Sequence, residues 1–413
     1  MTSAEAPLAG VLPGLLTRDL PGTGGTVRAR PEDFYVEEIP LVAPSGAGPY
    51  VLVGIEKRGI DTPSAVRALA RALRVPPARI AYAGLKDARA VARQVLSVEG
   101  LSPERVLRVR IPEVRVLWAE RHARPLRAGD LRRNRFVIRI RDVSPGAQAR
   151  ARAVLDVLAR RGVPNGFGPQ RFGLRGDNHL LGRAMVRGDW PAFCDLLLGR
   201  PAPEDPDAAR EARRAYARGD LRRALDLWPE HLREEREVLA ALAAGRAPER
   251  AAARLPGGLR RLFGAAYQAY LFNALLDARL PEIDRLEHGD LAIVHATDAF
   301  YPVEDPAAEQ PRADRFEISP SGPLVGFKVR LAREGVGDRE HGLLRREGVR
   351  PGDFRRVAGA RLVGERRAFR VPLEAVEVVA DGGDLVLRFA LPPGAYATSV
   401  LREVTKTEDA DKG

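Results

Sequence analysis

Hydrophobic and polar positions alternate most clearly over residues 135–141. Phe136, Ile138 and Ile140 stand at every second position, and arginines occupy three of the other four positions, with Val137 at the fourth. Because successive side chains of a strand point to opposite faces, this pattern predicts a half-buried β-strand. Similar but shorter signals predict further strands over residues 80–83, 94–98, 375–379 and 385–390.

Helical spacing of hydrophobic residues appears in other parts of the chain. Thr62 is the expected N-cap of a helix that ends at Pro76. Residues 263–276 also have a helical pattern, and the stretch from 200 to 260 is rich in Ala, Arg and Glu and is predicted to be helical. Strands and helices are mixed without regular β-α-β order, which indicates an α+β fold. A mixed region at each end and a different region between them suggest an inserted domain.

Composition narrows the class of protein. The 413 residues suffice for two domains, and 45% hydrophobic with 30% charged residues excludes a wholly disordered or membrane-embedded chain. No run reaches the roughly 18 apolar residues of a membrane-spanning helix. The N-terminus does not resemble a secretion signal. Cys194 is the single cysteine, which excludes a disulfide framework and suits a reducing compartment. We therefore expect a cytoplasmic protein without a membrane segment.

The net charge of +12 favours a polyanionic partner such as a nucleic acid. However, only five of the 67 basic residues are lysine, and such a bias toward arginine is also typical of coding bias. Charge alone therefore gives moderate support to nucleic-acid binding. Where arginine is the default, the internal Lys57 and Lys86 hint at positions that need a compact ammonium group.

Motifs of the familiar cofactor-dependent enzymes are missing from the sequence. The GTGG at 22–25 lacks the strand and helix of a dinucleotide site, and there is no phosphate-binding loop, no HExxH and no G-x-S-x-G. The six histidines are scattered without the spacing of metal ligands. The sequence therefore predicts neither a metal nor a cofactor.

The segment YAGLKDARAVARQ (82–94) carries the first candidate site. A predicted strand ends at Gly84 and would deliver Lys86 and Asp87 to its carboxyl end. An ionised aspartate beside a cation can act as a nucleophile or as a base. The alternative is that Asp87 merely caps a following helix, and local sequence leaves both interpretations open.

Two further segments are candidates for binding a nucleotide. Asn134 and Phe136 lie two positions apart, so a strand would present an amide and an aromatic ring on one face, as an unstacked base requires. The alternative is that Phe136 joins Ile138 in the core. The segment PNGFGPQRFG (164–173) combines glycines and phenylalanines with Gln170 and Arg171, which suits a shaped binding loop.

At these segments the sequence resembles the TruD family of tRNA pseudouridine synthases. The resemblance extends from about residue 28 to 403, and the family's blocks occur in the family's order. They are RPEDFYVEE, YAGLKDARAVARQ, GVPNGFGPQRFG, AYQAYLFN and LPPGAYATSVLRE. The stretch from 200 to 260 resembles nothing in particular.

The resemblance implies an α+β fold in which a pseudouridine synthase domain with a mostly antiparallel sheet is interrupted by an inserted α+β TRUD domain. RNA would be held between the two. The expected catalytic domain is discontinuous, over residues 23–164 and 359–405, and the inserted domain covers 165–358. A flexible lead-in over 1–22 and a charged tail over 406–413 complete the chain.

The resemblance also implies roles for individual residues. Asp87 matches the catalytic aspartate of the GLKD block, and Arg28 is the cation expected to pair with it. Asn134 and Phe136 match the N-x-F residues that line the active site, where Phe136 would stack on the uracil. The expected substrate-binding residues are Arg28, Phe34, Lys86, Asn134, Phe136, Gln170 and Arg171.

The implied reaction isomerises uridine to pseudouridine in tRNA, in the family's usual case at position 13. It exchanges neither electrons nor phosphate, which agrees with the missing cofactor motifs. Asp87 would either attack the sugar or remove its 2′ proton, and the sequence does not choose between the two. We expect a monomer. The alternative function is an RNA-binding protein or RNA chaperone that keeps the fold without turnover, and a metal-dependent nuclease has weaker support.

Overall fold

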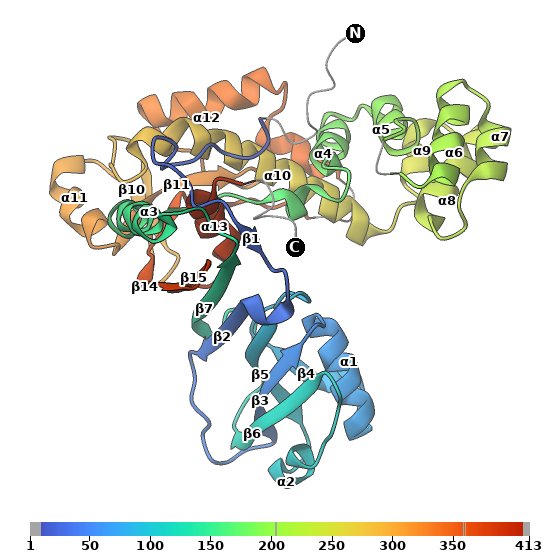
Figure 1. Cartoon of the computed structure of the whole chain (residues 1–413). Coiled ribbons are helices and arrows are strands. Elements are labelled where there is room, and N and C mark those ends of the chain that lie inside the picture. Colours follow the sequence, from blue (N-terminus) through green and yellow to red (C-terminus); the bar gives the residue numbers. More distant parts are fainter. Residues whose placement is uncertain (1–9, 203–204, 358, 360, 408–413) are drawn as a thin grey trace. The chain divides into compact units, whose positions relative to one another are not determined.

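The computed structural model describes residues 10–202, 205–357, 359 and 361–407, and it divides the chain into two units (Figure 1). The sheet unit comprises Leu15–Asn165 and Val371–Gly413. The insert unit comprises Met1–Gly14 and Gly166–Arg370. Residues 1–9 of the expected lead-in and 408–413 of the expected tail lie outside the described residues.

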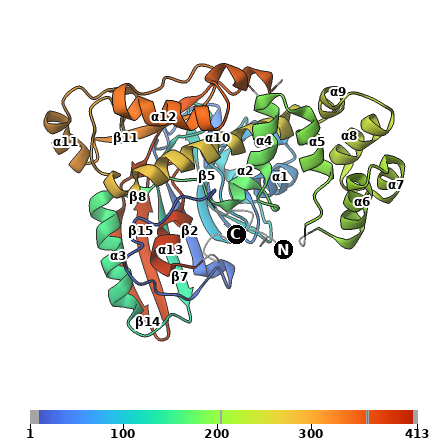
Figure 2. The same ribbon diagram turned by 90° about the horizontal axis from the view of Figure 1, so that it is seen from above.

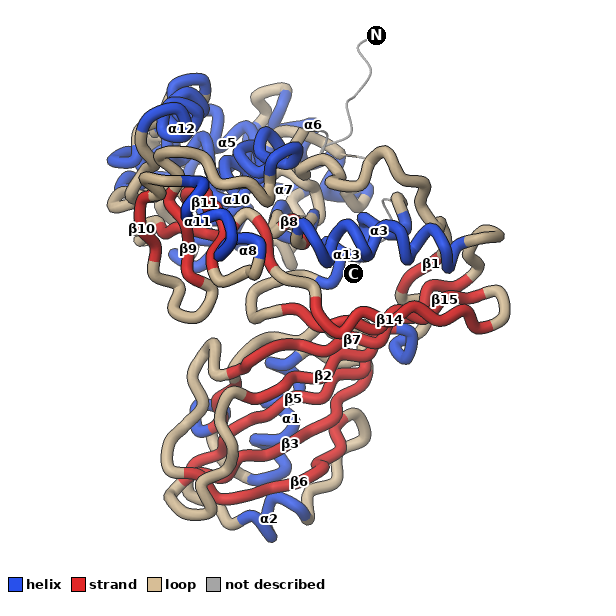
Figure 3. The backbone as a smooth tube through the Cα atoms, turned by 90° about the vertical axis from the view of Figure 1, so that its left-hand side faces the viewer, coloured by secondary structure: helices blue, strands red, loops and turns tan. Residues whose placement is uncertain are grey.

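Nine of the described strands of the sheet unit form one sheet (Figure 3). Its main order is β14-β15-β7-β2-β5-β3-β6, while β1 pairs with β7 and β4 pairs with β5. Among these strands the neighbours are antiparallel, apart from the parallel pair β2 and β5. The strands are β1 (Thr26–Val27), β2 (Phe34–Pro40), β3 (Tyr50–Arg58), β4 (Ile80–Tyr82), β5 (Val91–Glu99), β6 (Val114–His122), β7 (Leu131–Arg141), β14 (Glu374–Asp381) and β15 (Asp384–Leu391). The predicted α+β class with a mostly antiparallel sheet is confirmed.

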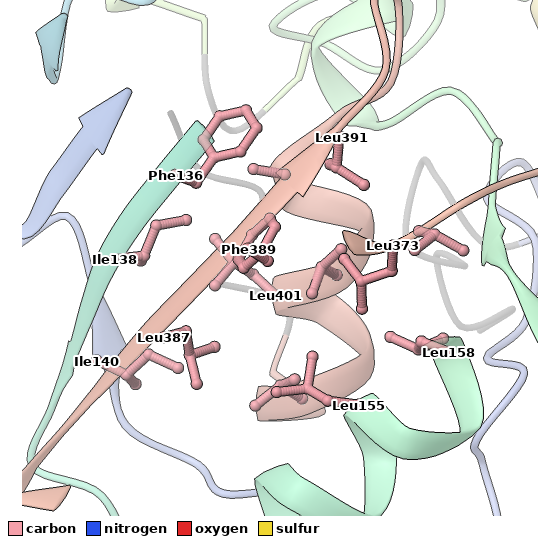
Figure 4. Packing of buried hydrophobic residues seen from close by; sticks show 14 of the residues in the cluster. Phe136, Ile138, Ile140, Leu155, Leu158, Leu373, Leu387, Phe389, Leu391 and Leu401 are labelled. Atoms are coloured by element: carbon pink, nitrogen blue, oxygen red, sulfur yellow. The ribbon is translucent and has the colours of Figure 1, made fainter. Parts of the chain in front are cut away.

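Two hydrophobic cores flank this sheet. The first joins β2, β7 and β15 to helices α3 (Ala147–Arg161) and α13 (Ala397–Thr405), which also pack against each other (Figure 4). The second joins β3 and β5 to helix α1 (Thr62–Leu73), and the short helix α2 (Pro103–Leu107) contributes Val106. Each fully buried Leu or Ile in these cores contributes about 1.5–3 kcal/mol of transfer free energy, so the packing of these helices stabilises the sheet. The first core includes Phe136, Ile138, Ile140, Leu155, Leu158, Leu387, Phe389 and Leu401.

The start of helix α1 differs from the prediction that Thr62 is its N-cap. Asp61 is the N-cap, and its Oδ1 accepts a hydrogen bond from the Ser64 N–H at 2.7 Å. Thr62 is fully buried, and its hydroxyl bonds to other elements instead. Aspartate is at least as good an N-cap as threonine, so the neighbouring residue takes this role and leaves Thr62 for a different one.

The arginine-rich face of β7 is neutralised by acidic side chains of neighbouring segments. Arg135 pairs with Glu37, Arg139 pairs with Asp381 and Asp384, and Arg141 pairs with Asp33. Phe136, Ile138 and Ile140 occupy the opposite, buried face, as the alternation predicts. A large part of the basic charge in this strand is therefore matched within the fold.

The part of the lead-in around Thr17 is bound to helix α13 by hydrogen bonds. Thr17 is buried, and its N–H and hydroxyl both donate to the Glu403 carboxylate, at 3.0 and 2.5 Å. The Leu16 N–H also donates to Glu403. Lys406, at the end of α13, donates from Nζ to the Thr17 carbonyl at 2.7 Å. This stretch of the chain is therefore tied to the C-terminal helix of its own unit.

The insert unit contains helices α4 to α12 (Figure 2). It also contains a small antiparallel sheet of order β10-β9-β11-β12. Helix α10 contains the predicted helix 263–276. It packs closely on α4, as Gly182 shows: a Cβ added there would lie 2.1 Å from the Phe263 carbonyl oxygen. The predicted helical stretch 200–260 contains helices α6 to α9 and the start of α10. The elements are α4 (Asn178–Arg187), α5 (Trp190–Leu198), α6 (Asp207–Ala217), α7 (Leu221–Leu227), α8 (Arg233–Ala243), α9 (Pro248–Ala252), α10 (Gly257–Arg279), α11 (Pro306–Asp314), α12 (Glu334–Arg346), β9 (Leu291–Val294), β10 (Phe300–Pro302), β11 (Ile318–Leu324) and β12 (Glu365–Ala368). Across the described residues, none of the helices has the length and apolar character that crossing a membrane requires.

Candidate active site

Asp87 lies in the loop that connects β4 to β5. Strand β5 follows this loop, so the alternative that Asp87 caps a helix is wrong. The Asp87 side chain is 49% exposed, and its Oδ2 accepts a hydrogen bond from Arg28 at 2.8 Å. The Arg28 side chain is only 5% exposed. A buried guanidinium thus presents one N–H to an accessible carboxylate, which is a charge-assisted hydrogen bond that fixes the carboxylate's orientation.

The guanidinium of Arg28 packs on the ring of Phe34. The Arg28 Cζ lies 4.2 Å from the centroid of the Phe34 ring, within the range of a cation–π contact. Phe34 itself is buried at the start of β2. Arg28 has a φ of 60°, which is uncommon for a residue with a side chain, so the chain adopts a strained backbone where it delivers this arginine.

Phe136 lies in the hydrophobic core, as the alternative interpretation of its strand position stated. Its ring stacks on Phe389 with 5.3 Å between centroids and meets Phe34 edge-on at 6.0 Å. Only 6% of the residue is exposed. To stack over a base with its full face, the ring would have to leave this packing. In the present arrangement it packs against Phe34, the residue whose ring contacts Arg28.

Asn134 lies on the same face of β7, two residues before Phe136. It is the cross-strand neighbour of Glu38 on β2 and of Leu391 on β15. Its Oδ1 is buried, and none of the described residues donates a hydrogen bond to it. Buried amide oxygens in proteins are normally paired, so this oxygen is an exception among the described residues.

Lys86 does not pair with its neighbour Asp87. Its Nζ forms an ion pair with Glu38 at 2.7 Å, and the two side chains are 6% and 1% exposed. Glu38 also accepts a hydrogen bond from the Val95 N–H. The cation beside Asp87 is therefore Arg28, and Lys86, which was expected to contact the substrate, instead fixes the loop to β2 from within.

Sequence reasoning missed Thr62 and Gln94, which join this network. The Lys86 N–H donates to the Thr62 hydroxyl at 2.9 Å, and that hydroxyl donates to Gln94 Oε1 at 2.9 Å. Both side chains are buried. The sequence holds one signal for Thr62. The residue before it, Asp61, is the better N-cap, so the Thr62 hydroxyl is not needed as a cap and is free to bind another group.

Lys57, one of the few lysines of the chain, also contacts the loop that carries Asp87. It is fully buried, and its Nζ donates to the carbonyl of Asp87 at 2.7 Å and to the carbonyl of Ile60 at 2.6 Å. In the described part of the chain it forms no ion pair. Burial lowers the pKa of the Lys57 ammonium to about 8, although the charges of Asp87 and Asp61 act in the opposite direction.

This lowered pKa predicts a pH-dependent contribution to stability. The unfolded lysine has a pKa near 10.5 and the folded one about 8, so the folded state releases its proton first as the pH rises. The desolvation cost is fully present below pH 8 and is lost between pH 8 and 10.5. The free energy of unfolding of the native protein, minus that of Lys57→Met, should therefore rise across this window by about 3 kcal/mol. Denaturant titrations at several pH values measure it, and a flat difference would contradict the prediction.

Gln170 and Arg171 belong to the insert unit and are described within it. They form part of a short 3-10 helix, Pro169–Phe172, in which Gln170 is exposed. The Arg171 Cζ lies 5.1 Å from the centroid of the Phe167 ring, and the Phe167 N–H donates to Asn273 Oδ1 at 2.8 Å. An arginine on an aromatic ring beside an exposed amide is a surface that can meet a base or a phosphate.

A metal centre is not evident in the described ranges. Nowhere in residues 10–202, 205–357, 359 and 361–407 do three or more His, Cys, Asp or Glu side chains gather as metal ligands would. The side chains that bind Asp87 and Lys86 are instead the Arg28 guanidinium, the Lys57 ammonium, the Glu38 carboxylate and the Thr62 hydroxyl.

Comparison with known proteins places this arrangement in a family. The family model described as tRNA pseudouridine synthase D (TruD) matches residues 14–404. The chain belongs to the TruD family. Among TruD-family proteins, the tRNA pseudouridine synthase D of Geobacter metallireducens is 49% identical over 394 residues, which cover 95% of this chain and 97% of that protein. That of Anaeromyxobacter dehalogenans strain 2CP-1 is 40% identical over 404 residues, covering 96% of this chain and 98% of that protein.

The fold comparison agrees with this TruD assignment. A crystal structure of a candidate tRNA pseudouridine synthase D from Methanosarcina mazei superposes with a TM-score of 0.86. The two sequences are 30% identical, and the match covers 100% of both chains. Membership of the TruD family supports pseudouridine synthase activity, an isomerase reaction on tRNA.

Proposed function

We propose that this TruD-family protein converts uridine to pseudouridine at position 13 of tRNA, with Asp87 as the catalytic carboxylate. One observation carries the proposal. Asp87 is an accessible carboxylate held at a defined place, because a buried guanidinium binds its side chain and buried groups bind the adjoining main chain. A carboxylate of this kind is the group that the isomerisation needs.

The reaction can be written with this one carboxylate. The N1–C1′ bond of uridine breaks, the freed uracil turns, and C5 joins C1′ while the C5 proton is released and N1 takes up a proton. Asp87 either attacks C1′ and is displaced when C5 bonds, or removes the 2′ proton and returns it. In both routes the arginine beside it, Arg28, keeps one carboxylate oxygen bound and leaves the other oxygen to react.

Neighbouring groups are assigned to the uracil and the RNA. The unpaired Oδ1 of Asn134 can accept an N–H of the base. Phe34 and Phe136 support the site from the core side. In the insert unit, Gln170 and Arg171 would contact the RNA. Extruding the target nucleotide costs a few kcal/mol, which the other RNA contacts must supply.

We further propose that the sheet unit is the catalytic domain and the insert unit the TRUD domain, and that the protein acts as a cytoplasmic monomer without a metal ion. The assignment of the sheet unit is supported because Arg28, Asp87 and Asn134 all lie in it. The proposal that no metal takes part predicts that activity survives excess EDTA.

The test uses two tRNA transcripts that differ only at position 13, one with uridine and one with cytidine. The purified protein should form pseudouridine at position 13 of the first and none in the second, as mapped by carbodiimide labelling and primer extension. Tight binding of the uridine transcript without any pseudouridine would favour the RNA-binding alternative. Modification of both transcripts at another position would refute the assignment of position 13.

A further inference from the structure

The catalytic loop has no regular secondary structure to hold it. Between β4, which ends at Tyr82, and β5, which begins at Val91, the backbone forms bends and stretches without regular structure. A carboxylate on such a segment is well placed only if other groups fix the main chain. Misplacing a reacting group by about 1 Å can cost on the order of 10²-fold in rate.

Three buried side chains from other elements hold the Lys86–Asp87 dipeptide. Thr62, in the first turn of α1, accepts the Lys86 N–H at 2.9 Å, and Glu38 on β2 binds the Lys86 ammonium at 2.7 Å. Lys57 on β3 binds the Asp87 carbonyl at 2.7 Å. Lys57 is the group in this set that contacts the main chain of Asp87 itself.

We propose that Lys57 is a positioning residue for the reaction, and that its ammonium fixes the Asp87 main chain so that the carboxylate is held in its reactive place. Because this inference rests on the proposed role of Asp87, it concerns the same site. Lys57 reaches the site through the Asp87 carbonyl and has no exposed surface with which to touch the RNA.

The energetic cost of Lys57 supports a functional reason for its presence. An ammonium buried without an ion pair is unfavourable, because two carbonyl dipoles replace its hydration shell only in part. An apolar side chain would fill the same volume in β3 without that cost, and in a chain with 62 arginines a lysine is the exception. The compact ammonium can bind the Ile60 and Asp87 carbonyls together, from a stem that fits a closed core.

The ammonium also bridges the two segments that adjoin the site. The Ile60 carbonyl lies just before α1, and the Asp87 carbonyl lies in the catalytic loop. The Gly59 N–H donates to the Ala90 carbonyl at 3.3 Å, so the same two segments touch again at the far end of the loop. Removing Lys57 would leave the second of these contacts and release the first.

The experiment compares Lys57→Met with Lys406→Met in the full-length protein. Lys406 is a matched control, because its ammonium also donates to a main-chain carbonyl in the sheet unit, that of Thr17. Hydrogen exchange is measured for a peptide covering residues 83–90, with a β15 peptide as the reference for global stability. Pseudouridine formation gives kcat and KM for tRNA.

For Lys57→Met, exchange in residues 83–90 should rise by about 10-fold relative to β15, as loss of one hydrogen bond predicts. Its kcat should fall by about 10²-fold with KM for tRNA nearly unchanged. Lys406→Met should match the native protein in both. Unchanged exchange in residues 83–90 overturns the inference whatever the activity, and so does increased exchange with a native kcat. Failure of the proposed function would show differently, as native protein that forms no pseudouridine.

Discussion

Replacing Asp87 with asparagine is expected to lower the rate of pseudouridine formation by about 10²–10⁴-fold. Asparagine has the same shape, and its amide oxygen can still accept the hydrogen bond from Arg28. It can neither attack C1′ as an anion nor take a proton from the 2′ carbon. The loss should therefore appear in the rate constant of the chemical step, measured under single-turnover conditions, while the affinity for tRNA stays within a few-fold of native.

The matched control for this substitution is Asp156→Asn. Asp156 is an exposed carboxylate on helix α3 of the same unit, so the change in charge is identical and the site is untouched. It should leave the rate at the native value. A purified Asp87→Asn protein that forms pseudouridine at the native rate would remove Asp87 from the mechanism.

Among the substitutions proposed here, those that break the buried Lys86–Glu38 pair are expected to lower the free energy of unfolding most. Lys86→Met leaves the Glu38 carboxylate 1% exposed and without its cation, and Glu38→Leu leaves the ammonium in the same position. Each single substitution should lower the free energy of unfolding by roughly 3–5 kcal/mol, because an isolated buried charge remains. The double substitution removes both charges and should cost clearly less than the sum of the two.

Urea unfolding of the four proteins measures this cycle. The control is Arg388→Met, which breaks the ion pair of Arg388 with Glu377, where both side chains are about half exposed. An exposed pair of this kind contributes about 0–1 kcal/mol. If Lys86→Met costs no more than Arg388→Met, the burial of Lys86 has no energetic consequence, and its anchoring role is wrong.

The local sequence pattern predicted the strands and helices that have one buried and one exposed face. The alternation at Phe136 and Ile138 placed β7 correctly, because one face of that strand is in the core. Strand β5 begins at Val91, three residues before its predicted start. Val91 pairs with Tyr35 of β2, and that contact between distant segments leaves no trace in the local sequence.

The motif resemblance predicted part of the site. It identified Arg28 and Asp87, and in the structure the Arg28 guanidinium lies 2.8 Å from the Asp87 carboxylate. It did not identify the partner of Lys86, because Glu38 lies 48 residues away and reaches Lys86 through the register of the sheet. Phe136 was assigned to the uracil by motif, whereas the packing of Phe389 against its ring depends on a strand from the other end of the chain.

The pairing of β7 with β15 also has a consequence for how the protein is made. Asn134 is the cross-strand neighbour of Leu391, so β7 must wait for some 250 further residues to leave the ribosome before its partner arrives. During that interval one edge of the nascent sheet is open, and open edges invite pairing with foreign strands. Arg133 and Arg139 lie along this strand, and their acidic partners also come from the late segment, so their charges would discourage aggregation until synthesis is complete.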